Sequence, residues 1–143
     1  MSYNYKTLVR DYLVNNAAVK TVFSATLTGS CRVNMENLRA SASYPQILIG
    51  YGAGETTPGM DADESRIYLT CESKGSGTLH PYKEVGKLRS AIIGAIDDQS
   101  LSATSVCYHI RKFSEAEGYD EDKKVYWLHM GFTANFRQNT SLP

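Results

Sequence analysis

The side chains best suited to acid–base or metal chemistry in this sequence are its three histidines. His80 precedes a proline at a predicted helix start, whereas His109 and His129 fall in the last two predicted strands. If those strands pair, the two imidazoles could approach each other, as a metal site would require. No carboxylate stands at ligand spacing from them. We therefore interpret all three as surface or interface histidines and predict neither a catalytic residue nor a metal site.

Two stretches between residues 50 and 64 superficially suggest ligand binding. The run from Gly50 to Gly54 has the glycines of a dinucleotide fingerprint, but that pattern needs a helix directly afterwards to hold phosphate, and a loop composition follows. Asp61, Asp63 and Glu64 suggest a calcium loop but lack the closing glutamate of the twelve-residue pattern. No serine-nucleophile motif or activated cysteine pair is visible. We predict no cofactor and a protein that is not an enzyme.

Composition narrows the class of protein further. The chain has 143 residues, with 15 basic and 15 acidic side chains, so its net charge is zero. A dedicated nucleic-acid binder is usually basic, because neutralising phosphates drives its affinity. The three cysteines are widely spaced and include no CxxC pair, which favours buried free thiols over a zinc ribbon or disulfide framework.

The sequence also shows neither the pattern of a membrane span nor that of a signal peptide. No apolar run approaches the ~20 residues of a membrane span, so we expect no membrane association. The first residues lack the apolar core of a signal peptide, so we expect assembly in a cytoplasm.

The elements that must position these residues follow from apolar periodicity. The spacing predicts an α+β fold in two layers. One mainly antiparallel sheet of four to five strands carries an N-terminal helix and a long central helix on one face. We expect a single domain over residues 1–143, with a loose tail at about 138–143. The predicted helices cover about 3–15, 17–23 and 80–96, and the predicted strands cover about 31–34, 44–51, 66–71, 104–113 and 125–137.

The central helix has the clearest pattern. Thr78 is its predicted N-cap, and an apolar stripe from Val85 to Ile96 is predicted to face the sheet. We expect Glu84 and the neighbouring basic residues to lie mostly outside that stripe. Gly86 and Gly94 weaken the helix by about 1 kcal/mol each relative to alanine, so we expect them to allow close packing on the sheet.

Two polar connections are the candidate contact surfaces. The first, residues 52–64, is a glycine-rich acidic loop between two strands and is too long for a tight turn. The second, residues 114–124, is a charged connection that is either a solvated loop or a docking surface. We predict partner or subunit contacts at Gly54, Glu55, Thr57, Asp61 and Asp63 in the first, and at Glu115, Glu117, Tyr119 and Asp120 in the second.

The order of these segments resembles a known family. After the N-terminal helix come YPQILIGYG with TTPG, ESRIYLTCESK, PYKEVGKLRSAIIGAIDD and IRKFSEAEGYDEDKKVYWLHMGFTANFR. Together, over about residues 4–138, they resemble the tail-completion or tail-terminator proteins of long-tailed bacteriophages.

This resemblance implies an α+β subunit of a hexameric ring, located in the virion at the head–tail junction. Such a ring caps the tail tube, ends its polymerisation and joins it to the head connector, while DNA passes through the lumen without sequence-specific binding. The implied partners are further copies of the chain, the tail-tube protein and the head-connector or stopper protein. The alternatives are another neck, connector or tail-tube protein, or a small ligand-binding module whose loop at 52–64 closes as a lid.

Overall fold

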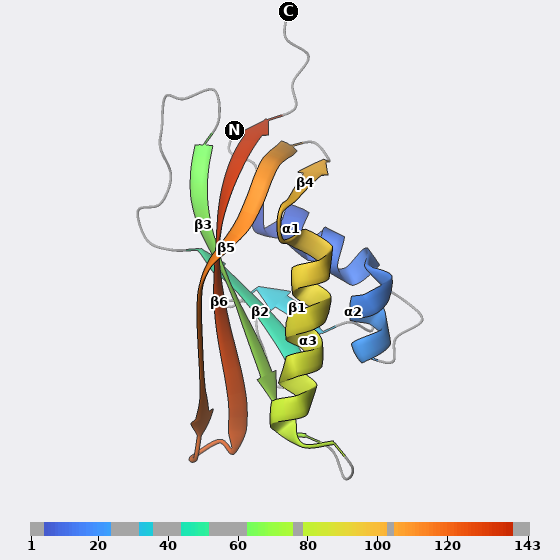
Figure 1. Cartoon of the computed structure of the whole chain (residues 1–143), viewed down its shortest axis with the longest axis vertical. Helices are drawn as coiled ribbons and strands as arrows, with labels where there is room; N and C mark the ends of the chain where they lie inside the picture. The colour runs from blue at the N-terminus through green and yellow to red at the C-terminus, as the bar shows by residue number, and fades with distance from the viewer. Residues whose placement is uncertain are drawn as a thin grey trace, which may run out of the picture.

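The computed structural model describes residues 5–23, 32–35, 44–51, 63–75, 79–102 and 105–138 (Figure 1). No helix within these ranges is long and apolar enough to cross a membrane. In chain order the elements are α1 (Tyr5–Asn15), α2 (Ala17–Val22), β1 (Val33–Met35), β2 (Gln46–Tyr51), β3 (Asp63–Ser73), α3 (Pro81–Ile96), β4 (Gln99–Ser102), β5 (Ser105–Asp120) and β6 (Val125–Gln138).

The strands form one sheet in the order β1-β2-β3-β6-β5-β4. Only β1 and β2 run parallel, and every other neighbouring pair is antiparallel. The predicted α+β fold with a mainly antiparallel sheet is therefore confirmed. The sheet has six strands in the described part of the chain. The additional one is β4, a four-residue strand whose sequence, QSLS, has no alternation strong enough to mark it.

The helices cover one face of the sheet. In Figure 1, α1 and α3 lie on the same side, with α2 packed on the far flank of α3. Alternate residues of the central strands point into the layer between them, as a strand's two-residue period requires. On β6, four alternate side chains face this layer and are buried: Leu128, Met130, Phe132 and Ala134.

The N-cap of helix α3 lies two residues after the predicted one. His80, rather than Thr78, is the N-cap: its backbone is extended and its Nδ1 accepts from the Tyr82 N–H at 3.2 Å. A neutral imidazole can cap in this way because one ring nitrogen is an acceptor. Pro81 then occupies the first helical position, where a missing N–H loses no hydrogen bond. The helix ends at Ile96, as predicted, before Asp97 and Asp98.

The largest error in the predicted topology is the charged connection at 114–124. Strand β5 continues through it to Asp120, each residue from Ser114 onward pairing with β6, and the turn is only residues 121–124. Local composition argued against a strand, since Glu, Gly and Asp are poor strand formers. The apolar partner strand overrides this preference, and beyond Ile110 no described strand pairs with the outer edge of β5. Charged side chains are tolerated on such an edge.

Candidate interaction surfaces

The histidines do not assemble a chemical site. The last two strands do pair, but His109 is in register with Asn135 and His129 with Ala116, so the pairing does not bring the two imidazoles together. His109 Nε2 lies 2.9 Å from an Asp98 carboxylate oxygen, and His129 Nδ1 lies 2.9 Å from the Thr70 hydroxyl. Among the described side chains, no three His, Cys, Asp or Glu groups gather as metal ligands.

Cys71 does not have the character of a nucleophile. Its side chain is fully buried in the core. Burial raises the pKa of the thiol far above its ordinary value, and the negative charges of Glu115 and Glu72 raise it further. Because the thiolate is the reactive form, this cysteine is an inert core residue at neutral pH. The predicted burial of the free thiols is confirmed at this position, while the side chains of the other two cysteines lie outside the described residues.

The structure places only part of the predicted contact set. Gly54, Glu55, Thr57 and Asp61 lie outside the described residues. Asp63 is the first residue of β3, opposite Phe136, rather than part of the preceding loop. The second predicted group is brought together: it occupies the last six residues of β5 at the end of the β5–β6 hairpin. Its members there are Glu115, Glu117, Tyr119 and Asp120.

The helix-facing side of this hairpin is tied to α3. Glu115 accepts from Arg89 at 2.7 Å and from Lys112 at 3.0 Å. Desolvation acts to raise the pKa of Glu115, but hydrogen bonds and positive charge from those two residues outweigh it and lower the pKa. Further along, the Tyr82 and Tyr126 rings meet edge to face with centroids 6.0 Å apart. The hairpin is thus held against α3.

The hairpin ends in a well-defined tip, residues 119–124. The Asp120 carboxylate accepts from the backbone N–H groups of Asp122 and Lys123 at 3.0 and 3.1 Å. Lys124 closes the turn with a left-handed φ of 57°. The Tyr119 side chain is 51% exposed, and Glu121 is also exposed. The tip therefore presents an aromatic ring, the carboxylates of Glu121 and Asp122 and the ammonium groups of Lys123 and Lys124 on a backbone that is already ordered.

The sheet face opposite the helices carries an aromatic cluster that sequence reasoning missed. The Tyr68 ring stacks on His129 at 5.1 Å and meets Phe113 edge to face at 6.2 Å. The Arg66 guanidinium lies 5.1 Å from the centre of the Phe113 ring. Phe113 lies where the β5–β6 register shifts between Lys112 and Ser114, and no period-two count of the sequence predicts such a shift.

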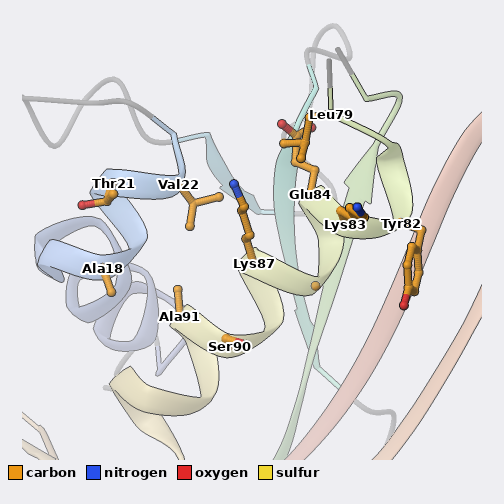
Figure 2. Close-up of a pocket in the computed structure, with 11 residues that line it drawn as sticks. Ala18, Thr21, Val22, Leu79, Tyr82, Lys83, Glu84, Lys87, Ser90 and Ala91 are labelled. Atoms are coloured by element: carbon orange, nitrogen blue, oxygen red, sulfur yellow. The ribbon is translucent and has the colours of Figure 1, made fainter. Parts of the chain in front are cut away.

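An open groove of about 1120 Å³ lies between α2 and the outer side of α3. In Figure 2, Val22 and Ala91 point into it from the two helices, and Lys87 stands at its centre. Gly86 also lines this α2–α3 groove, and a Cβ added there would meet nothing within 4 Å. The same is true of Gly94. Both glycines are exposed, so the predicted close packing on the sheet is wrong.

Glu84 also departs from the prediction. It is 9% exposed rather than on a solvated face, and its carboxylate accepts from the hydroxyl of the fully buried Ser73 at 2.5 Å. The same hydroxyl accepts from the Gly75 N–H at 2.8 Å. Ser73 therefore joins the end of β3 to the first turn of α3. Helical periodicity alone could not reveal it, because the partner is eleven residues away.

Comparison with known proteins shows a relationship of fold. No protein-family model and no curated protein matches the sequence. Among solved structures, the chain is similar to a chain from a structure described as the virion of a native gene transfer agent particle, with a TM-score of 0.69. The match covers 92% of each chain at 10% sequence identity. At this identity the likeness establishes a shared fold over nearly the whole chain.

Proposed function

We propose that this chain is a structural protein of a phage or phage-like virion. The observation that carries the proposal is the fold shared over 92% of both chains with a component of a gene transfer agent virion. The family resemblance of the sequence points the same way and is independent of the structural match. The proposal also has the protein acting without catalysis, which agrees with the polar partners of His109 and His129 and with the burial of Cys71.

The more specific role that we propose is a ring at the head–tail junction. In this role six copies cap the tail tube, end its polymerisation and join it to the head connector, with DNA passing through the lumen. A ring subunit needs two different patches that fit each other on successive copies. Two candidate patches lie on opposite flanks of α3: the α2–α3 groove, shown in Figure 2, and the hairpin tip, at the end of the β5–β6 hairpin in Figure 1.

The test is the mass and shape of the assembly. Purified protein is analysed by light scattering and native mass spectrometry, alone and after mixing with tail tubes that lack a terminator. A discrete assembly of about six copies, seen by electron microscopy at one end of each tube, is the expected result. Open-ended tubes formed by the chain itself would instead assign it to the tail tube. A stable monomer that binds a metabolite and ignores tube ends would overturn the virion role.

A further inference from the structure

The α2–α3 groove has the composition of an acceptor site for an acidic, partly apolar segment. Its floor holds small or apolar side chains such as Ala18, Val22 and Ala91. Lys83 and Lys87 are exposed and line the groove from one face of α3, four residues apart. The carboxylate that reaches the groove, Glu84, is already engaged by Ser73. The groove therefore presents two ammonium groups beside an apolar floor.

The hairpin tip carries a complementary acidic pair, which the exposed Lys123 and Lys124 follow in the chain. Tyr119 supplies a half-exposed aromatic ring, and Glu121 and Asp122 supply exposed carboxylates at the far end of the turn. The two Asp120 hydrogen bonds fix the turn before any partner arrives. A segment that is already ordered loses little conformational entropy on docking.

We propose that the hairpin tip of one copy docks in the α2–α3 groove of the next copy, with Glu121 and Asp122 facing Lys83 and Lys87. This inference rests on the proposed ring, for which it supplies the contact between neighbouring subunits. Matching charges of this kind fix register and suppress wrong pairings more than they add affinity.

The placement of the two surfaces explains why they meet between copies rather than within one. In both figures α2 lies on one side of α3, and the β5–β6 hairpin lies on the other. Helix α3 therefore stands between the tip and the groove of the same molecule. A donor and an acceptor on opposite flanks of one subunit form a head-to-tail contact, which closes into a ring when the rotation per subunit allows it.

Charge exchange tests the contact directly. The variant Lys83→Glu/Lys87→Glu and the variant Glu121→Lys/Asp122→Lys each turn two attractions into repulsions. Each should raise the protein concentration at half-assembly by at least about tenfold. The chain carrying all four changes regains opposite charges across the contact and should assemble like the wild type. The variant Lys20→Glu/Lys74→Glu has the same change of net charge as Lys83→Glu/Lys87→Glu but lies outside the groove, so it is the matched control for that variant and should assemble normally.

A steric pair gives a second test that does not depend on charge. Gly86→Leu places a side chain in the groove, whereas Gly94→Leu places the same side chain at an equally open position of α3 outside it. Both variants should fold, as circular dichroism would show, and only Gly86→Leu should impair assembly. Equal behaviour of the two variants, or failure of the four-change chain to recover, overturns the contact.

Cross-linking separates this inference from the proposed function. A photoreactive residue replaces Ser90 in the groove, and isotopically heavy and light chains are mixed before irradiation. Cross-links from the groove to residues 119–124 of another copy, within discrete rings, support both proposals. The same cross-links in open-ended tubes support the contact and overturn the terminator role. Rings without these cross-links overturn the contact alone, and a monomer with none, or with cross-links only within one chain, overturns both.

Discussion

The buried hydrogen bond between Ser73 and Glu84 gives the sharpest prediction about stability. Ser73→Ala removes the hydroxyl that donates to the Glu84 carboxylate at 2.5 Å and accepts from the Gly75 N–H at 2.8 Å. Neither Ser73 nor Glu84 has ready access to water, at 0% and 9% exposure. The variant therefore leaves a buried carboxylate without its donor, where the sheet meets the start of α3.

The magnitude follows from the kind of bond lost. Hydrogen bonds to charged groups contribute about 1.5–3 kcal/mol, and a buried group left unsatisfied adds its desolvation penalty. We expect Ser73→Ala to lower the free energy of unfolding by about 2–3 kcal/mol. At roughly 3 °C per kcal/mol for a chain of this size, the melting temperature should fall by about 6–9 °C.

The assay is urea unfolding of the monomer followed by circular dichroism, with Ser90→Ala as the control. Ser90 is an exposed serine of α3, so its replacement should change stability by less than about 0.5 kcal/mol. The double variant Ser73→Ala/Glu84→Met removes both polar partners together and should be more stable than Ser73→Ala alone. A loss below about 0.5 kcal/mol for Ser73→Ala would refute the reasoning. So would a double-mutant cycle in which the effects of Ser73→Ala and Glu84→Met on the free energy of unfolding are strictly additive.

Three further predictions can be checked by thermal and pH-dependent unfolding. Gly86→Ala and Gly94→Ala should each stabilise the monomer by about 0.5–1 kcal/mol, because a helical alanine replaces a glycine and the new methyl meets nothing within 4 Å; a lowered melting temperature would contradict this. Gly118→Ala should destabilise by about 1–3 kcal/mol, since its Cβ would lie 2.6 Å from the Trp127 ring, and an unchanged midpoint would show that the ring moves freely. Glu115→Gln should lose up to about 1 kcal/mol at pH 7. Because the folded pKa of Glu115 is lowered, that loss is present above the unfolded pKa and disappears as the pH falls through the folded value, so a difference that persists at low pH would argue against the ion pairs.

The parts of the fold that sequence predicted are those with strong apolar periodicity and one buried face. Strand β6 has alternating apolar residues from Tyr126 onward, and the side chains at 128, 130, 132 and 134 are buried as expected. Helix α2 also lies close to its predicted range, with Val19 and the C-cap residue Phe23 buried. In both elements the spacing of apolar residues along the chain determines which positions are buried, so local reasoning is sufficient.

The second half of β5 could not be predicted in this way, because its structure depends on residues far along the chain. Glu115, Glu117 and Gly118 have weak strand preference, and they are ordered by pairing with Met130, Leu128 and Trp127. The candidate surfaces could not be predicted for the same reason, because they too depend on residues far apart in the chain. Glu84 is buried and accepts a hydrogen bond from a serine on another element, and the groove exists only because α2 packs against α3.

The proposed contact between tip and groove joins neighbouring subunits within one ring. It therefore does not by itself distinguish a terminator from a tail-tube protein. A tube subunit and a terminator subunit both need a lateral contact that repeats around a ring. They differ along the axis: a tube ring must present two axial faces that fit each other, whereas a terminator must present one face that fits the tube and one that rejects a further ring. Disrupting the groove should therefore weaken assembly under either role. Only growth beyond a single ring, with the groove intact, separates a terminator from a tube protein.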